Sequence, residues 1–600
     1  MIITQLAGSP VSVELQHVLF GADAGAHEQW MRLFNEDRFA FREGLTHEER
    51  TALSYERLRL VNAVIPDLCA LVADPPALTA VHEHAGVADA GMATIFSIHT
   101  NLFLGSLLDH DHTGRDLTPY VDLARIGTFL CTERGHGNDA AQLETTATFD
   151  QASGGFVLHT PTAAASKFMP NTSSVGGAKD ALVAARLIVA GEDHGVFLFL
   201  TPLTDEAGRH LPGVHVSRLP QTASSPVDHC ETRFDHVRLP FTALLQGEHG
   251  RLTPEGRFSS TLQSPRTRFL RSIGRVTMGK LCMSAYSVGV MRHAVTVAVR
   301  HAHTRITSAG MSRERVPLFA HRSHHAPLLD ALATSYAATL LQRLAVQRWM
   351  RASGAEREDA DRLAAIAKGW ITWAARDVMT VCRERCGAHG LLLSTGIAYQ
   401  AAANEGAITA EGDNLVIWIK AAGEMLLGGF VPAPVYEVPP ESRTLDNPLH
   451  LQNLMADLEH IPRERARARL RARDAGRGMQ RWNGAVEPAI QFIRAHANRL
   501  AAQELLKASE HAGSPQVRQL LGDLHRLFVL RQVAACSGEL MADGRLTADH
   551  VRQLPDELDQ VVAALQPHAG ILAEAFAAPS DKGRTRSLFL HGEAAQAVPV

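Results

Sequence analysis

The chain has 600 residues, of which 46% are apolar and 20% are charged, and this balance is typical of a globular protein. The formal net charge of −4 gives no electrostatic reason to expect nucleic acid or an anionic membrane as a partner. Seven scattered cysteines, an odd number, argue against a disulfide framework and for a reducing compartment.

Both ends of the chain and its most apolar stretch indicate a soluble protein. The first residues, MIITQL, have no basic region before an apolar core, so we expect no signal peptide. Residues 181–200 are interrupted by Arg186, Glu192 and Asp193, which excludes a membrane span there. The last residues, AVPV, are not a peroxisomal tripeptide. We therefore expect a cytoplasmic protein with no membrane partner.

The length predicts roughly three or four domains, because a single core stops growing beyond about 250–300 residues. Residues 1–125 show apolar positions at helical spacing, with a break at the proline pair 75–76, and predict an N-terminal helical domain. Residues 93–108 are apolar nearly all round, which predicts a buried helix.

Residues 126–255 have a different texture. Short runs rich in Val, Phe, Leu and Thr alternate with Gly, Pro and Asp, as in residues 155–160, 195–201 and 232–237. This spacing predicts a compact antiparallel β domain, either a barrel or a sandwich.

Helical patterns resume near Arg266 and fill residues 256–430, with breaks at 308–310, Pro317 and Gly354. The proline-rich segment 431–440 is a plausible boundary, and residues 441–600 predict a last helical domain with a poorly packed tail beyond Pro579. The fold class is therefore α+β, mainly α: a helical domain, a β domain and two further helical domains.

Glu411 lies just before a strong helical run, residues 415–427, which stops at the glycine pair 428–429. Asp413 and Asn414 are good N-cap residues, so Glu411 should lie at the mouth of this helix. A carboxylate held there beside a glycine suits a base that removes a proton next to a carbonyl group. An ordinary loop acid before a buried helix is the alternative interpretation.

Three motifs give the chain a resemblance to a known family. Residues 131–139 (CTERGHGND) and 143–150 (LETTATFD) form the first, residues 386–390 (CGAHG) the second, and residues 411–414 (EGDN) the third. Together with the weaker pattern DHVRLP at 235–240, they resemble the acyl-CoA oxidase family of the acyl-CoA dehydrogenase superfamily, in its actinobacterial form. The resemblance covers residues 80–430 well, and the last helical block only in length and position.

The resemblance implies an acyl-CoA dehydrogenase/oxidase-like fold with a central β-barrel domain, and FAD as the cofactor. It implies that Glu411 is the catalytic base. The residues expected to bind the cofactor are Thr132, Gly137, Asn171, Arg305, Gly387, Gly390 and Asp413. Glycines let a backbone approach a cofactor closely, and the threonine hydroxyl can donate to the ring edge.

The implied reaction is α,β-dehydrogenation of an acyl thioester in fatty acid metabolism. Glu411 removes the α-proton while a hydride leaves the β-carbon for flavin N5. The oxidase-like motifs and the extra helical block favour O2, reduced to H2O2, as the acceptor, and an electron-transfer flavoprotein is the alternative. The partners implied are an acyl-CoA or acyl-carrier-protein thioester and a second copy of the chain, because the family arginine often contacts the cofactor across a dimer.

Departures from the family pattern keep alternatives open. Ala410 replaces the usual aromatic residue before the base, Asn171 and Thr172 replace a glycine pair, and Ile306 replaces the glutamine after Arg305. A biosynthetic dehydrogenase acting on a carrier-bound acyl group, a flavin monooxygenase, and a catalytically silent scaffold of the same fold are the alternatives. Glu411 counts against the monooxygenase, because such relatives typically lack the glutamate.

Two other patterns are given less functional weight. Histidine clusters at 110–112, 301–303 and 321–325 invite a metal interpretation, but none has a recognised metal spacing, so we expect no metal. The arginine run at 463–473 has a two-residue step, which scatters the charges around a helix. We expect a solvated helix or an acid-paired interface there instead of a nucleic-acid site.

Overall fold

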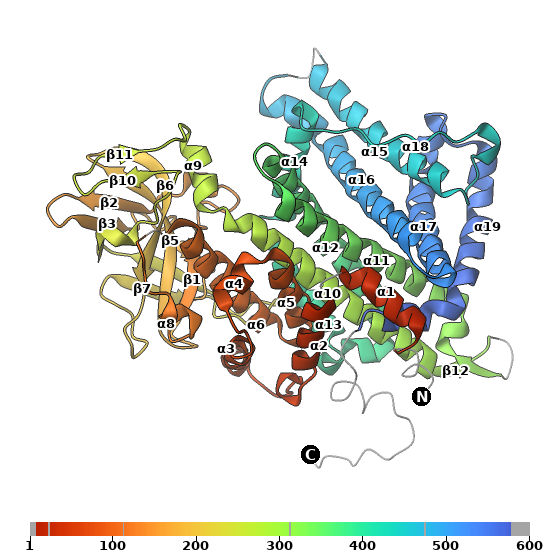
Figure 1. Ribbon diagram of the computed structural model, residues 1–600, viewed down its shortest axis with the longest axis horizontal. Coiled ribbons are helices and arrows are strands. Elements are labelled where there is room, and N and C mark those ends of the chain that lie inside the picture. Colours follow the sequence, from red (N-terminus) through yellow and green to blue (C-terminus); the bar gives the residue numbers. More distant parts are fainter. Residues whose placement is uncertain (1–7, 22–23, 112, 311–313, 473–475, 578–600) are drawn as a thin grey trace. The chain divides into compact units, whose positions relative to one another are not determined.

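The computed structural model describes residues 8–21, 24–111, 113–310, 314–472 and 476–577, so the tail beyond Pro579 lies outside the described residues. The chain forms two compact units: unit 1 comprises residues 1–41 and 283–600, and unit 2 comprises residues 42–282. Figure 1 labels their helices and strands. The predicted four-domain division uses other boundaries and stays a prediction.

The first part of unit 2 is helical, as the spacing of apolar residues predicts. Its helices, with α9 following the strands, are α3 (His47–Asn62), α4 (Leu68–Ala73), α5 (Pro75–Ala88), α6 (Ala90–Phe96), α7 (Gly105–His110), α8 (Thr118–Val121) and α9 (Pro265–Ser272). Local caps explain their starts: Thr46 and Glu49 form a capping box on α3, and Asp74 caps α5. The proline pair 75–76 interrupts the pattern because it opens α5.

The predicted buried helix is present, with a segment of wider π-helical turns, Ser97–Leu104, between α6 and α7. The whole stretch Ala90–His110 is long and apolar enough to cross a membrane, but 83% of its apolar window is buried inside the protein, as in a core helix. It packs closely on the first strand: a Cβ at Gly127 would lie 2.1 Å from the Phe103 ring.

Two larger sheets and one two-stranded sheet form the β part of unit 2. The strands are β1 (Ile126–Leu130), β2 (Thr146–Asp150), β3 (Gly155–His159), β4 (Lys167–Phe168), β5 (Lys179–Val189), β6 (Glu192–Pro202), β7 (Val214–Arg218), β8 (Cys230–Phe234), β9 (Val237–Leu239), β10 (Arg251–Leu252) and β11 (Phe258–Ser259). Six strands form one sheet in the order β1-β5-β2-β3-β9, with β6 paired to β5. β4, β8 and β7 form the second sheet, and β10 and β11 pair with each other.

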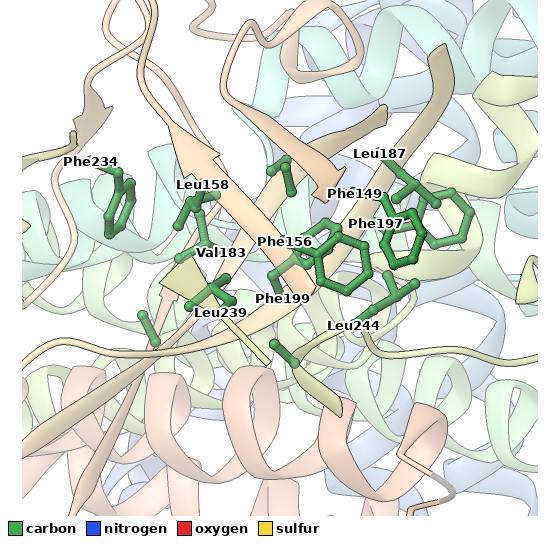
Figure 2. Packing of buried hydrophobic residues seen from close by; sticks show 14 of the residues in the cluster. Phe149, Phe156, Leu158, Val183, Leu187, Phe197, Phe199, Phe234, Leu239 and Leu244 are labelled. Atoms are coloured by element: carbon green, nitrogen blue, oxygen red, sulfur yellow. The ribbon is translucent and has the colours of Figure 1, made fainter. Parts of the chain in front are cut away.

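The expectation of a purely antiparallel domain is wrong for two pairings. β5 runs parallel to both β1 and β2, with Ile126 opposite Lys179 and Thr146 opposite Arg186. The run of strands in the sequence could not reveal this, because the strands that pair in parallel are far apart along the chain. Figure 2 shows the core of the large sheet, in which Phe156, Phe197 and Phe199 pack with aliphatic neighbours.

His99 joins the π-helical segment to β1 through its ring nitrogens. Its Nδ1 accepts from the Gly127 N–H at 2.8 Å, and its Nε2 lies 3.0 Å from the Tyr120 carbonyl, so both ring nitrogens are engaged in the neutral form. Burial lowers the pKa of His99 to about 4, although the Tyr120 hydrogen bond opposes this.

We expect the stability of the protein to fall as pH drops from about 6.5 toward about 4, because the unfolded chain protonates His99 before the folded protein does. This residue alone should cost about 2 kcal/mol by pH 5. Thermal unfolding between pH 7.5 and 5 should show a smaller acid loss in His99→Gln than in the parent. Equal losses in the two proteins would contradict this.

Unit 1 consists of helices and one small hairpin. The helices are α1 (Pro10–Phe20), α2 (Ala24–Phe34), α10 (Arg275–Thr304, which begins in unit 2), α11 (Arg322–Arg351), α12 (Glu356–Arg385), α13 (Ile397–Thr409), α14 (Asn414–Leu427), α15 (Pro448–Arg471), α16 (Met479–His511), α17 (Pro515–Ala535), α18 (Ser537–Ala542), α19 (Ala548–Leu565) and α20 (Ala569–Glu574). The hairpin pairs β12 (Ile306–Ser308) with β13 (Arg315–Pro317). Short turns η8 (Gly387–Leu391) and η9 (Leu393–Thr395) join α12 to α13. In Figure 1, α11, α12, α16 and α17 lie side by side.

Residues 463–471 of the arginine run lie in the second half of α15, and several of these arginines are paired with acids, whereas Arg473 lies outside the described residues. Arg463 and Arg467 donate to Glu464 at 2.9 and 3.1 Å, and Arg465 donates to Glu539 at 2.9 Å. The acid-paired interpretation of this run is confirmed for these three arginines.

Candidate active site

The turn between α13 and α14 carries Glu411 in an unusual backbone conformation. The φ angles of Glu411 and Gly412 are +59° and +94°, and the side chain of Glu411 is half-buried. A positive φ is uncommon outside glycine, and such strained residues cluster at functional sites. The predicted cap is confirmed: the Asp413 carboxylate accepts from the Leu415 N–H at 3.0 Å. This places Asp413 as a helix cap, and a cofactor contact for it stays a prediction.

A chain of buried hydrogen bonds holds the start of α14 to the neighbouring helices. Asn414 Nδ2 donates to Thr372 Oγ1 at 2.8 Å, Asn404 Nδ2 donates to the Thr372 carbonyl at 2.9 Å, and Ser287 Oγ donates to Asn404 Oδ1 at 2.7 Å. Helices α10, α12, α13 and α14 are therefore fixed to one another next to Glu411.

Arg305 and the turn η8 meet at His301. The rings of His301 and His389 are 5.5 Å apart, and His301 is buried. Burial lowers the pKa of His301 to about 4, and electrostatic interactions with His389 and Arg305 act in the same direction. His301 therefore lies close to His389 of this turn and within the electrostatic influence of Arg305, and a cofactor contact for Arg305, Gly387 or Gly390 stays a prediction.

The same region of unit 1 collects further basic groups. Burial lowers the pKa of His324 to about 4, and Arg385, His301 and His321 act in the same direction. In the part of the chain that the structure describes, no hydrogen-bond partner reaches Nε2 of His321, Nε2 of His324 or Nε of Arg385, all of which are buried. Arg385 also lies 3.8 Å from Glu384. We call His301, His321, His324, Arg385 and Arg305 the basic cluster.

The two glycines of η8 serve different purposes. A Cβ at Gly390 would lie 2.3 Å from the Arg383 carbonyl, so packing within the chain already requires glycine there. Gly387 has φ +57°, and a Cβ there would meet no atom within 4 Å, so its backbone is open to a ligand. The sequence could not separate these two roles.

The first motif in unit 2 is built around a buried carboxylate. Glu133 Oε1 accepts from Thr145 N, Thr145 Oγ1 and Lys167 Nζ at 2.9, 2.6 and 3.0 Å, and its Oε2 accepts from Glu144 N at 2.6 Å. Lys167 and Glu133 are both inaccessible to solvent. The hydrogen bonds of the buried Glu133 carboxylate therefore hold the loop after β1 in place.

Thr132 stands exposed next to that buried acid, beside two exposed apolar residues. Its carbonyl accepts from the Phe168 N–H at 2.9 Å, and Phe168 and Met169 are each 37% exposed. Met169 has φ +66°, a backbone conformation that is uncommon for residues other than glycine. Gly137 is exposed, and a Cβ there would meet nothing within 4 Å. Sequence reasoning missed Phe168 and Met169 because exposure of an apolar residue leaves no local signal.

Asn171 is fully buried and its side chain is already occupied. Its Oδ1 accepts from Thr128 Oγ1 at 2.5 Å, and its Nδ2 donates to Tyr55 Oη at 3.1 Å. Lys179 Nζ donates to the Asn171 carbonyl at 2.8 Å and to Asp228 at 2.7 Å. The network explains why polar residues stand where the family has glycines, and a cofactor contact for Asn171 stays a prediction.

Two features lie apart from these residues. In unit 1, a cavity of about 330 Å³ is lined by Trp370, Trp373 and Trp418 among others, but Glu411 is not one of its lining residues. In unit 2, ligand atoms of His159, Asp235 and His236 lie within 4.8 Å of one another, although the two imidazole rings stack at 4.0 Å. The sequence did not predict this His–Asp cluster, because His159 is distant from the other two along the chain.

Two family models match successive parts of the chain. The model described as acyl-CoA oxidase, C-alpha1 domain, matches residues 274–426. The model described as acyl-CoA oxidase matches residues 460–582.

Curated relatives carry the same family name at modest identity. An acyl-coenzyme A oxidase-like protein of Mus musculus is 29% identical over 329 residues, which are 54% of this chain and 52% of that protein. The peroxisomal acyl-coenzyme A oxidase 1 of Mus musculus is 26% identical over 524 residues, 80% of this chain and 77% of that protein. The chain thus spans about half the length of the first relative and three quarters of the second.

Solved structures have the same fold. The structure of acyl-CoA oxidase3 from Yarrowia lipolytica has a TM-score of 0.85 at 19% identity, with 96% of this chain and 88% of that chain covered. Acyl-CoA oxidase-2 of Caenorhabditis elegans, solved with FAD, ascaroside-CoA and ATP, has a TM-score of 0.82 at 19% identity, with 96% and 90% covered.

The fold is therefore that of the acyl-CoA oxidases, as the motifs predict. The two family models and the curated relatives make this chain similar to acyl-CoA oxidases over most of its length. The actinobacterial detail finds no support in these relatives, which come from a mammal, a yeast and a nematode.

Proposed function

We propose that this protein is an FAD-dependent oxidoreductase that acts on the CH–CH group of an acyl-CoA, with Glu411 as the base that removes the α-proton. The observation that carries the proposal is the Glu411 turn. Glu411 is half-buried, has a positive φ and lies just before α14. Buried hydrogen bonds hold this helix to its neighbours. A turn held in this way helps to set the direction of the carboxylate in advance, which removal of a weakly acidic C–H proton requires.

The residues of unit 1 fit the anionic part of FAD. The basic cluster gathers two arginines and three histidines, and buried nitrogens of His321, His324 and Arg385 have no partner among the described residues. Buried donors without partners are costly unless a ligand supplies the acceptors. A diphosphate supplies several, and it would also favour protonation of the histidines.

The residues of unit 2 fit the ring of a flavin. Thr132 offers an exposed hydroxyl, and Phe168 and Met169 offer exposed apolar surface beside it. When bound, the flavin supplies the hydride acceptor at N5, which no amino acid side chain can replace. The chain's own contribution is to bind and orient the thioester and to take the α-proton on Glu411.

Arg385→Met should weaken FAD binding by about 10- to 100-fold, since a hydrogen bond to a charged group is worth about 1.5–3 kcal/mol. Arg383→Met is the matched control. Arg383 lies on the same helix and near the same acid, 3.5 Å from Glu384, but it does not belong to the basic cluster. Equilibrium titration of apoprotein with FAD, followed by flavin fluorescence, measures both. Equal affinities of the two variants would remove Arg385 from the proposed diphosphate site.

Anaerobic titration of the flavoprotein with a panel of acyl thioesters tests the proposed function. Acyl-CoA should bleach the flavin absorbance, and admission of air should restore it if O2 is the acceptor. The same acyl group on a carrier protein forms the second arm, and faster bleaching there would favour the biosynthetic alternative. A protein that binds no flavin would support the silent scaffold instead.

The acceptor, assembly and location are parts of the same proposal. We propose O2 as the electron acceptor and a homodimer as the assembly, on the family resemblance. The cytoplasmic location also stays a prediction, since the mouse relative described above is named peroxisomal.

A further inference from the structure

Lys368 is a lysine in the middle of α12 whose side chain is completely buried. Its Nζ donates to the Ile408 carbonyl at 2.8 Å and to the Gly412 carbonyl at 2.9 Å. The Ile408 carbonyl belongs to the last turn of α13, where carbonyls lack helical partners and the helix dipole is negative. The Gly412 carbonyl lies just before α14. One ammonium group therefore joins the two ends of the turn that carries Glu411.

This turn needs support from outside. The positive φ of Glu411, a non-glycine residue, persists only where the surrounding structure over-determines it. Other contacts act further along: Asn414 binds Thr372, and Trp418 Nε1 donates to the Ile366 carbonyl at 3.2 Å. They fix α14 after the turn, whereas Lys368 holds the turn itself.

We propose that Lys368 is a positioning residue for Glu411, an inference that rests on the proposed role of Glu411 as the base. Its hydrogen bonds fix the backbone on both sides of the carboxylate. We expect its positive charge, held against the same turn as Glu411, to favour the ionised form of the Glu411 carboxylate, the form that accepts a proton. A lysine that only stabilised the fold would do the first and leave the acidity of the base unchanged.

The test compares Lys368→Met with the parent flavoprotein. Methionine keeps the length of the side chain and removes both the charge and the hydrogen bonds. We expect FAD to remain bound and the rate of flavin reduction by acyl-CoA to fall by about 10²-fold, the effect of displacing a reacting group by about 1 Å. We also expect the acid limb of the pH profile of this rate to move to higher pH, because the base then protonates more readily.

Thr372→Val is the matched control. It removes a hydroxyl that holds α14 from the same stretch of α12, and it changes no charge. Its rate should fall less, and the acid limb of its profile should stay in place. Lys368→Gln, which keeps hydrogen-bond donors but not the charge, should restore part of the rate without restoring the profile.

The outcomes separate this inference from the proposed function. If Glu411→Gln is inactive and Lys368→Met keeps the parent rate and profile, the role of Lys368 is refuted while that of Glu411 stands. If Glu411→Gln reduces its flavin normally, the base assignment fails first. If Lys368→Met does not fold, Lys368→Gln decides: an unshifted acid limb in that variant overturns the inference.

Discussion

Glu411→Gln should reduce flavin reduction by acyl-CoA by about 10²- to 10⁴-fold, the range for removing a general base, while FAD stays bound. Glutamine has the same shape but cannot accept the α-proton, and the strained turn, its Asp413 cap and its Gly412 should be preserved. Stopped-flow absorbance under anaerobic conditions measures the rate directly.

Glu405→Gln is the matched control for this experiment. Glu405 lies on α13, close to Glu411 in sequence, and is half-exposed near Arg376 at 3.7 Å. Its removal should leave the rate of flavin reduction within about twofold of the parent, as for most surface substitutions. A Glu411→Gln protein that still reduces its flavin at the parent rate would show that another group takes the proton.

Glu133→Ala should lower the free energy of unfolding by about 3–5 kcal/mol, because it leaves the buried ammonium of Lys167 without a counter-ion. Burial lowers the pKa of Lys167, and the charge of Glu133 opposes this. Thermal and denaturant unfolding measure the loss.

The double variant Glu133→Gln/Lys167→Met supplies the control. Replacing both members of a buried ion pair with neutral groups of similar size is often nearly neutral. The double variant should therefore be more stable than Glu133→Ala. If Glu133→Ala loses less than about 1 kcal/mol, the pair is not what holds the first motif in place.

Local signals in the sequence were sufficient to predict the Glu411 turn. Asp413 and Asn414 are strong helix starters, and the glycine pair 428–429 ends the helix, so the bounds of α14 follow from neighbouring residues alone. The same holds for the start of α5 at its proline pair. Short-range rules predict such elements well because the interactions that decide them lie within a few residues.

Contacts between distant residues could not be predicted. Lys368 is 40 and 44 residues from the carbonyl groups that it binds, and no pattern in α12 marks it. Asn171 reads as a departure in a cofactor loop, but its partner Tyr55 lies 116 residues away. The parallel pairings of β5 with β1 and β2 could not be predicted for the same reason, because these strands are distant along the chain. In each case the contact joins residues that are far apart in the sequence. Local patterns therefore could not show which partner a residue has.

The central claim is that the protein converts an acyl-CoA to the 2-enoyl-CoA with Glu411 as base and O2 as acceptor. The most direct measurement incubates the purified flavoprotein with a saturated acyl-CoA in air and quantifies the 2-enoyl-CoA and the H2O2 formed. We predict equal amounts of the two products, and neither from Glu411→Gln. A hydroxylated acyl-CoA, or no consumption of acyl-CoA by a protein that holds FAD, would contradict the account.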